Sequence, residues 1–163
     1  MFKSNGKLLI WSLFIVLIDQ LTKFAVLKNM HYLESVQILG DFLRLTFIKN
    51  PGIAFGIEVG NKLFFTIFAA IASLLILIYL FRIKPEAFWS RFALALILGG
   101  AIGNLIDRIL YQEVIDFIDI RIIHWPVFNV ADIAVTVGMV ILIASVIFNK
   151  QHIDTNDEQL GIK

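Results

Sequence analysis

The run LFFTIFAAIASLLILIYLF, residues 63–81, contains no charged side chain and is long enough to cross a bilayer as a helix. The hydrocarbon core is about 30 Å thick and a helix rises about 1.5 Å per residue, so about 20 apolar residues span it. Three more apolar runs are present. The sequence therefore predicts an all-α membrane bundle with four transmembrane helices, at about residues 8–28, 62–82, 90–109 and 130–149.

The composition is that of a membrane protein. Apolar residues make up 59% of the chain and charged residues 17%, and the mean hydropathy is +0.85. The 163 residues leave room for a single integral membrane domain, residues 1–163, because four spans of about 20 residues each use about half of them. A net charge of +1 without a basic block argues against nucleic-acid binding. The absence of cysteine excludes disulfides and thiolate chemistry.

The first apolar run has two interpretations. It begins at Leu8 behind Lys3 and Lys7, an arrangement typical of a secretory signal peptide. However, it continues into Asp19 and Lys23 without a cleavage site of small residues. We therefore expect an uncleaved first span.

The charges of the connecting segments predict the orientation. The short connection between the second and third runs carries Arg82, Lys84 and Arg91 against a single acidic residue, Glu86. Basic residues are enriched in cytoplasmic loops. This connection, and with it both termini of a four-span chain, is therefore expected to be cytoplasmic.

The segment between the first two spans is expected on the outer, extracytoplasmic side. In residues 31–61, Leu43, Leu45 and Phe47 alternate with Arg44 and a threonine. Alternation of this kind is typical of a half-buried strand. We therefore predict a small extracytoplasmic β-rich segment.

The segment between the last two spans, residues 110–129, is predicted to lie at the outer interface. Val114, Phe117 and Ile118 recur at helical spacing, which favours a short interfacial helix. Beyond the fourth span, residues 151–163 form a polar tail that we expect to be mobile.

Polar residues interrupt the spans toward one end of the bundle. Because the spans alternate in direction, polar residues late in the first and third spans and early in the fourth share the outer face. Ionisable groups at membrane depth cost roughly 2.5 to 3.5 kcal/mol each, so this gathering indicates a site near the outer leaflet. The residues are Asp19, Lys23, Asn104, Asp107, Arg108, Asn129 and Asp132, with Asn50 and Gly52 from the outer segment.

Structural explanations also exist for the residues within the spans. Asp19 and Lys23 are four residues apart, so an ion pair on one helical face accounts for both. Asn104 and Arg108 have the same spacing, and an arginine near the end of a span reaches the headgroups. Asp132 at the start of a helix fits an N-cap.

The residues outside the spans have structural explanations too. Asn50 and Gly52 flank Pro51, a composition that suits a simple turn. Asp116 and Asp119 fit the water-facing side of the predicted interfacial helix, and this explanation applies to Asp119 more than to Asp116. Local patterns alone leave these alternatives open.

Other classes of function fit the sequence less well. A transporter or proton-conducting bundle places ionisable groups through the whole membrane depth. A lipid-modifying transferase needs acidic clusters for a divalent metal, and a structural scaffold leaves the gathered polar groups unexplained. The histidines are dispersed and no Gly-x-Ser-x-Gly motif is present, which argues against zinc and serine hydrolases.

Five short motifs follow one another along the chain. They are DQLTK (19–23), NPGIAFG (50–56), GGAIGNLIDR (99–108), VIDF (114–117) and FNVAD (128–132). Each is a weak pattern alone, but five in this order on a four-span chain are specific. In these motifs the chain resembles the signal peptidase II family, the lipoprotein signal peptidases, which are bacterial membrane aspartic proteases.

The resemblance implies an aspartic endopeptidase that uses Asp116 and Asp132 as its catalytic pair, without a metal or other cofactor. The implied substrate is a prolipoprotein whose cysteine carries diacylglycerol, cut just before that cysteine. The implied location is the bacterial cytoplasmic (inner) membrane, with the site near the outer leaflet, and we expect a monomer in contact with membrane lipid. The resemblance further assigns substrate or dyad positioning to Asn50, Gly52, Asn104, Arg108 and Asn129, and structural support to Asp19 and Lys23.

Two aspartates suit peptide hydrolysis. Carboxyl groups brought close to one water do not readily both ionise, so they share a proton. The ionised group then accepts a proton from the water while the protonated group polarises the scissile carbonyl. The sequence does not assign the shared proton to either aspartate.

Overall fold

The structure, a computed structural model, describes residues 2–51, 62–84, 87–123 and 125–159, and within these ranges the side chains of residues 7–148. The described part contains four α-helices and one three-stranded sheet. The helices are α1 (Phe2–Asn29), α2 (Lys62–Arg82), α3 (Phe88–Tyr111) and α4 (Val130–Gln159). The strands are β1 (Ser35–Leu39), β2 (Leu43–Asn50) and β3 (Val114–Ile120).

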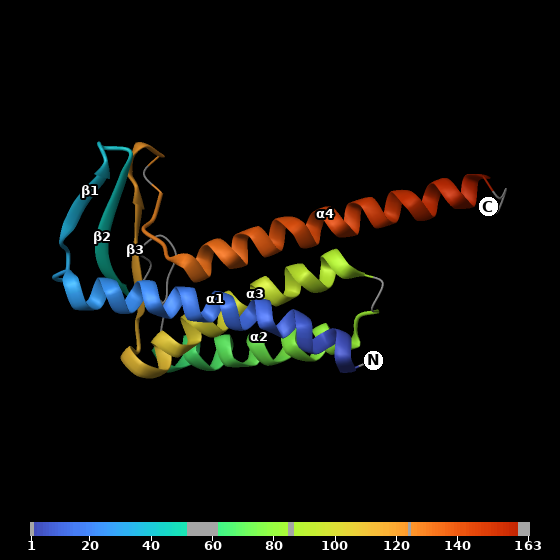
Figure 1. The fold of residues 1–163 in the computed structure, drawn as a ribbon, viewed down its shortest axis with the longest axis horizontal. Coiled ribbons are helices and arrows are strands. Elements are labelled where there is room, and N and C mark those ends of the chain that lie inside the picture. Colours follow the sequence, from blue (N-terminus) through green and yellow to red (C-terminus); the bar gives the residue numbers. More distant parts are fainter. Residues whose placement is uncertain (1, 52–61, 85–86, 124, 160–163) are drawn as a thin grey trace.

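Each helix contains a segment long and apolar enough to cross a membrane. These segments are Lys7–Asn29, Lys62–Arg82, Phe88–Tyr111 and Val130–Phe148. Figure 1 shows the sheet at one end of the bundle and both ends of the chain toward the other. The predicted four-span bundle with a small β-rich segment is therefore confirmed. Helix α4 continues through Gln159 into the polar tail, and residues 160–163 lie outside the described part, so the mobility of the tail stays a prediction.

Helix α3 is the central helix and contacts each of the other three. Glycines allow two of these neighbours to approach it closely. A Cβ at Gly99 would lie 2.9 Å from the carbonyl oxygen of Ser12 in α1, and a Cβ at Gly100 would collide with the carbonyl oxygen of Ala131 in α4. Small residues promote helix association in membranes through such backbone contacts. The glycines of α3 therefore set how closely α1 and α4 approach it.

Gly100→Ala is expected to lower the free energy of unfolding by about 1 to 3 kcal/mol. The added methyl group meets the backbone of α4, which has little freedom to move away. In an unconstrained helix the same change stabilises by about 1 kcal/mol, so a drop in Tm in detergent micelles reports the helix contact. Ala70→Leu, at an exposed position of α2, is the matched control and should leave Tm unchanged. A Tm that rises in Gly100→Ala would contradict this packing.

The sheet is antiparallel, with the order β1-β2-β3. Strands β1 and β2 form a hairpin within the segment that the sequence predicts to be β-rich. Strand β3 comes from the connection between α3 and α4, and it pairs with β2 so that Asn50 lies opposite Val114 and Ile48 opposite Asp116. This register holds the end of β2 beside Asp116.

The prediction of a short interfacial helix in residues 110–129 is wrong, because residues from Val114 onward form strand β3. Ile115 and Phe117 pack against Val26 of α1 and Phe47 of β2, and five of the seven residues of β3 are buried. A strand that is covered on both faces has no clean alternation of apolar and polar residues. Over this short window, the apolar residues of β3 therefore recur at a spacing that also fits a helix.

The prediction that Asp119 faces water is also wrong. Only 8% of this residue is exposed. Its carboxylate accepts a hydrogen bond from the Thr46 hydroxyl at 2.7 Å and forms an ion pair with Arg121 at 3.1 Å. A strand, unlike the expected helix, directs this side chain across the neighbouring strand β2.

Candidate active site

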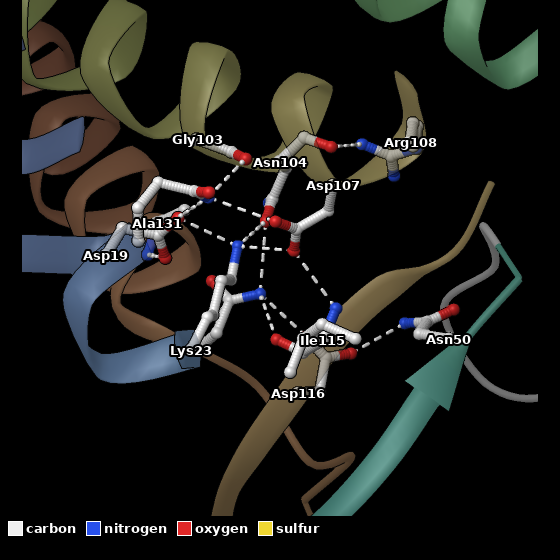
Figure 2. A network of polar contacts seen from close by, with 12 residues as sticks. Asp19, Lys23, Asn50, Gly103, Asn104, Asp107, Arg108, Ile115, Asp116 and Ala131 are labelled. Atoms are coloured by element: carbon white, nitrogen blue, oxygen red, sulfur yellow. Dashed lines mark hydrogen bonds and ion pairs between the residues drawn. The ribbon is translucent and has the colours of Figure 1, made fainter. Parts of the chain in front are cut away.

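The polar residues of the spans meet at the end of the bundle beside the sheet. They come from α1, α3, the start of α4 and the strands β2 and β3, and hydrogen bonds and ion pairs connect them into one network (Figure 2). The predicted site residues that belong to it are Asp19, Lys23, Asn50, Asn104, Arg108, Asp116, Asn129 and Asp132. Gly52, the remaining predicted site residue, lies outside the described residues.

Asp132 lies in the first turn of α4 and forms a reciprocal cap with Asn129. The Asn129 side-chain oxygen accepts a hydrogen bond from the backbone N–H of Asp132 at 3.0 Å. Asp132 Oδ2 in turn accepts one from the backbone N–H of Asn129 at 3.1 Å. Such a box satisfies amides that the start of a helix leaves unpaired. The N-cap is therefore Asn129 and not Asp132, and capping occupies only one of the two Asp132 oxygens.

Asn129 connects the two predicted catalytic aspartates. It is fully buried, and its Nδ2 donates to Asp116 Oδ1 at 2.6 Å while its backbone N–H donates to Asp132. From the end of β2, Asn50 Nδ2 donates to the other oxygen of Asp116 at 2.9 Å. Two carboxyl groups that are distant in the sequence are thus held on one bridging residue.

The surroundings of Asp116 change its acidity. Only 1% of the residue is exposed. Burial raises the pKa of Asp116 to about 7, and the negative charge of Asp132 acts in the same direction, whereas the hydrogen bonds from Asn50 and Asn129 oppose both. Near neutral pH, Asp116 therefore exchanges its proton readily, as a general acid or base must. A carboxyl group perturbed in this way is typical of a functional site.

Lys23 forms buried ion pairs with two carboxylates. Its Nζ lies 2.8 Å from Asp19 Oδ2 and 2.8 Å from Asp107 Oδ2, and all three side chains are at most 2% exposed. The ion pair expected from the four-residue spacing of Asp19 and Lys23 is present, and α3 adds the second carboxylate. Charges removed from water need such pairing, because an unpaired buried charge is strongly unfavourable.

The two carboxylates that bind Lys23 also hold the backbone of the site. Asp19 Oδ1 accepts a hydrogen bond from the backbone N–H of Ala131 in α4 at 2.9 Å. Asp107 Oδ2 accepts one from the backbone N–H of Ile115 in β3 at 3.0 Å. Each of these amides directly precedes one of the two predicted catalytic aspartates. The buried ion pairs therefore anchor both elements that carry the dyad.

Lys23 also determines the orientation of Asn104. The Nζ donates to Asn104 Oδ1 at 2.9 Å. Because an ammonium group only donates, the amide oxygen must face Lys23, which directs Asn104 Nδ2 to Asp132 Oδ1 at 2.8 Å. Together with the cap, both oxygens of Asp132 accept hydrogen bonds.

Arg108, one turn after Asn104 in α3, has donors left for a ligand. Its Nη1 donates to the backbone oxygen of Asn104 at 3.3 Å. Its Nε is buried without a hydrogen-bond partner among the described residues. Buried polar atoms are usually paired, so this group is a candidate for contact with a bound substrate.

Two members of the network received no role from the sequence. The sequence marks Asp107 only as a polar interruption of the third span, although an acidic residue in a span implies a buried cation nearby. Gln20 donates from Nε2 to Asp107 Oδ1 at 3.0 Å and to the carbonyl oxygen of Gly103 at 3.2 Å. Nothing in the sequence distinguishes Gln20 as a member of the network, because it is an uncharged residue directly beside Asp19.

The family model described as signal peptidase (SPase) II matches residues 11–148. This range includes the residues of the network and reaches into all four spans. The chain belongs to the signal peptidase II family. It is therefore a membrane protease, and both the predicted family and the predicted enzyme class are confirmed. The alternatives of a transporter, a lipid-modifying transferase and a scaffold receive no support.

Other proteins of the signal peptidase II family match most of this chain in sequence. The lipoprotein signal peptidase of Syntrophus aciditrophicus is 43% identical over 140 residues, which cover 82% of this chain and 87% of that protein. The lipoprotein signal peptidase of Burkholderia mallei is 46% identical over 148 residues, which cover 86% of this chain and 89% of that protein. The similarity therefore extends over nearly the whole length of both proteins.

Solved structures of bacterial membrane enzymes have the same fold as this signal peptidase II chain. One, determined by the in meso method at 2.3 Å resolution, has a TM-score of 0.82 and 33% sequence identity, covering 90% of this chain and 91% of that chain. Another, at 1.9 Å resolution, has a TM-score of 0.78 and 34% identity, covering 86% and 92%. The arrangement of spans and sheet is therefore shared with membrane enzymes.

Proposed function

We propose that this chain removes signal peptides from diacylglyceryl-modified prolipoproteins, cutting just before the lipidated cysteine with Asp116, Asp132 and one water. The observation that supports this most directly is Asn129, which hydrogen-bonds to both carboxyl groups. A single buried residue in contact with both aspartates supports the proposal that they act on the same water molecule.

The chemistry follows from the unequal environments of the two aspartates. Asp132 accepts hydrogen bonds on both oxygens and serves as the ionised base, whereas the raised pKa of Asp116 suits it to hold the proton. Asp132 takes a proton from water, and the water oxygen bonds to the scissile carbonyl carbon while Asp116 donates a hydrogen bond to the carbonyl oxygen. The carbon–nitrogen bond then breaks, and the leaving nitrogen takes up the proton that Asp132 removed from the water, which returns Asp132 to its ionised form.

The remaining network residues position these groups. Asn104 and Asn129 orient the aspartates, and Asn50 holds Asp116 from the end of β2. Arg108, with its buried Nε, is proposed to bind a backbone carbonyl of the substrate. Gly52 is proposed to allow close approach of the substrate backbone, and Asp19 and Lys23 are proposed to support the first helix.

The location follows from the membrane topology. We place the chain in the bacterial cytoplasmic membrane as a multi-pass protein with both termini in the cytoplasm, since the connection between α2 and α3 is basic. The site then lies near the outer leaflet, where a signal peptide held in the bilayer presents its lipidated cysteine. We further propose that the chain acts as a monomer.

A cleavage assay tests this function. The purified chain is incubated with a precursor that carries diacylglycerol on its cysteine, and with the same precursor lacking this modification. Release of the signal peptide is expected from the modified precursor only, with the new N-terminus at the cysteine. Equal cleavage of both precursors would show that the enzyme does not recognise the diacylglycerol. Cleavage at another bond would contradict the proposed cleavage position.

The pH dependence of cleavage should follow the proton on Asp116. The proton is lost as pH rises through about 7, so kcat/KM is expected to fall on the alkaline side of this value. The hydrogen bond from Asn50 stabilises the ionised form, and a bond to a charged group contributes roughly 1.5 to 3 kcal/mol. Asn50→Ala should therefore displace the alkaline limb upward by about one pH unit.

A matched control separates this effect from general damage to the sheet. Gln37→Ala in β1 removes an exposed amide that hydrogen-bonds to Asp41, far from the dyad in the hydrogen-bond network. Its pH profile should coincide with that of the unmodified protein. An alkaline limb that stays in place in Asn50→Ala, or moves downward, would contradict the role given to Asp116.

A further inference from the structure

A groove between α3 and α4 lies at the end of the bundle away from the active site. Its volume is about 490 Å³, and its apolar lining includes Phe88, Trp89, Val140, Ile141, Ala144 and Phe148. Ser90 and Ser145 also line it and are joined by a hydrogen bond of 2.8 Å between their hydroxyl groups. The groove is therefore mostly apolar, and its polar part is the hydrogen-bonded pair of serine hydroxyl groups.

The groove lies beyond a close contact between α3 and α4 at Gly138. At Gly138 the helices touch, since a Cβ there would lie 2.8 Å from the carbonyl oxygen of Ala93. Figure 1 shows α4 extending past the ends of the other helices. Leu142 packs against the cluster that includes Leu80 of α2, whereas Ala144 lines the groove. The groove therefore opens on a different face of α4 from the one that contacts this cluster.

The groove is separate from the active site and is lined by two of the membrane-spanning helices. Its residues in α3 and α4 belong to the spans Phe88–Tyr111 and Val130–Phe148. Ser90 precedes Asn104 by roughly 20 Å along α3, at about 1.5 Å of rise per residue. A substrate bound at the dyad does not explain this cavity.

The connection between α2 and α3 at this end of the bundle is basic on balance, with Arg82, Lys84 and Arg91 against Glu86, which lies outside the described residues. Ala87, which lines the groove, donates its backbone N–H to the carbonyl oxygen of Lys84 at 3.2 Å, and the Lys84 side chain is exposed. Arg82, at the end of α2, is exposed as well. Among the side chains described at this end, the charged ones are basic and none is acidic.

We propose that the groove binds one acyl chain of an anionic phospholipid, with Lys84 binding its phosphate. Basic residues beside pockets between transmembrane helices attract anionic headgroups. Trp89 lies at the start of α3, and tryptophan is enriched at the headgroup level where a membrane span begins or ends. The apolar lining accepts the hydrocarbon chain, and the positive charge at the mouth selects the headgroup.

Fluorescence quenching by brominated lipids tests this proposal directly. In a Trp11→Phe/Trp125→Phe background, Trp89 is the sole tryptophan, since the chain has three. The protein is reconstituted in phosphatidylcholine vesicles, and brominated phosphatidylglycerol or brominated phosphatidylcholine with the same chains is titrated in. Phosphatidylglycerol should quench Trp89 about fivefold more effectively, because one basic residue near the surface contributes about 1 kcal/mol.

Two pairs of variants locate the binding. Lys84→Gln should remove the preference for phosphatidylglycerol, while Lys28→Gln, at an exposed lysine of the opposite end of the bundle, should keep it. Ala144→Phe fills the groove and should also abolish the preference. Its control, Ile143→Phe, changes a neighbouring side chain that is 54% exposed and should have no effect. Lys84→Gln, Ala144→Phe and Ile143→Phe are expected to retain cleavage activity, because these positions lie at the end of the bundle away from the dyad. Lys28→Gln should retain it because it changes an exposed side chain to which the network gives no role.

Every other result overturns the proposal. Equal quenching by both lipids would show no selectivity, and a preference that survives Lys84→Gln would place the headgroup elsewhere. Weak quenching by both lipids would indicate that a protein segment or a second copy of the chain covers Trp89. If Ala144→Phe fails to fold, the exposed Lys84→Gln variant decides alone.

Discussion

Asp116→Asn and Asp132→Asn are each expected to lower kcat/KM for a lipid-modified precursor by about 10²- to 10⁴-fold. Asparagine keeps the size of the side chain but neither accepts a proton from water nor carries the shared one. Asn129 contacts both side chains, so each variant should remain folded. Cleavage by the purified variants, with Tm measured in parallel, gives the result.

The double variant sharpens this test. If the two aspartates act together on one water, removing either one already abolishes the contribution of the other. Asp116→Asn/Asp132→Asn should therefore be no slower than the worse single variant. Losses that multiply would indicate two independent roles. Retained turnover in either single variant would remove that aspartate from the mechanism.

Asp119→Asn is the matched control for the dyad variants. Asp119 lies on the same strand as Asp116 and is also buried, but its carboxylate binds Thr46 and Arg121 instead of the network. The change should weaken the sheet and lower Tm while leaving turnover per folded molecule close to that of the unmodified protein. A loss of turnover as large as in the dyad variants would show that damage to the sheet alone explains them.

Lys23→Met is expected to destabilise the fold by about 3 to 5 kcal/mol. The change leaves Asp19 and Asp107 buried without their cation, and both carboxylates also hold backbone amides of α4 and β3. Thermal unfolding in detergent micelles measures the loss. Because the same amides precede the dyad, we expect turnover to fall as well.

Compensating changes distinguish lost pairing from lost packing. Replacing a whole buried ion pair by uncharged groups of similar size is often close to neutral. The triple variant Lys23→Met/Asp19→Asn/Asp107→Asn should therefore recover most of the Tm that Lys23→Met loses. Lys28→Met, at an exposed position of the same helix, should leave Tm unchanged. A triple variant less stable than Lys23→Met would argue against uncompensated charge as the cause.

Much of the site was predictable because membrane insertion makes polar residues conspicuous. The hydropathy of the spans places Asp19 and Lys23 late in the first helix and Asn104 late in the third, and alternating span direction brings them to one face. The assignment of Asp116 and Asp132 as a pair came from the resemblance to a family and not from spacing. Local patterns offer a structural explanation for each of them as well, as an N-cap for Asp132 and as a water-facing position for Asp116.

What the sequence could not supply was the course of the chain between α3 and α4. A strand buried on both faces carries no alternation, so the residues of β3 predict a helix with Asp119 facing water. The choice between Asn129 and Asp132 as N-cap also depended on the backbone, since both residue types serve well there.

The number of spans, their limits and the face on which polar groups gather were determined by the sequence, because transfer into lipid acts on each segment separately. The network itself was decided by the tertiary structure. Lys23 meets Asp107, and Asn129 joins Asp116 to Asp132, only after α1, α3, α4 and β3 have packed. Hydrogen bonds and buried ion pairs depend on distances of about 3 Å between atoms far apart in the chain, and packing alone sets those distances.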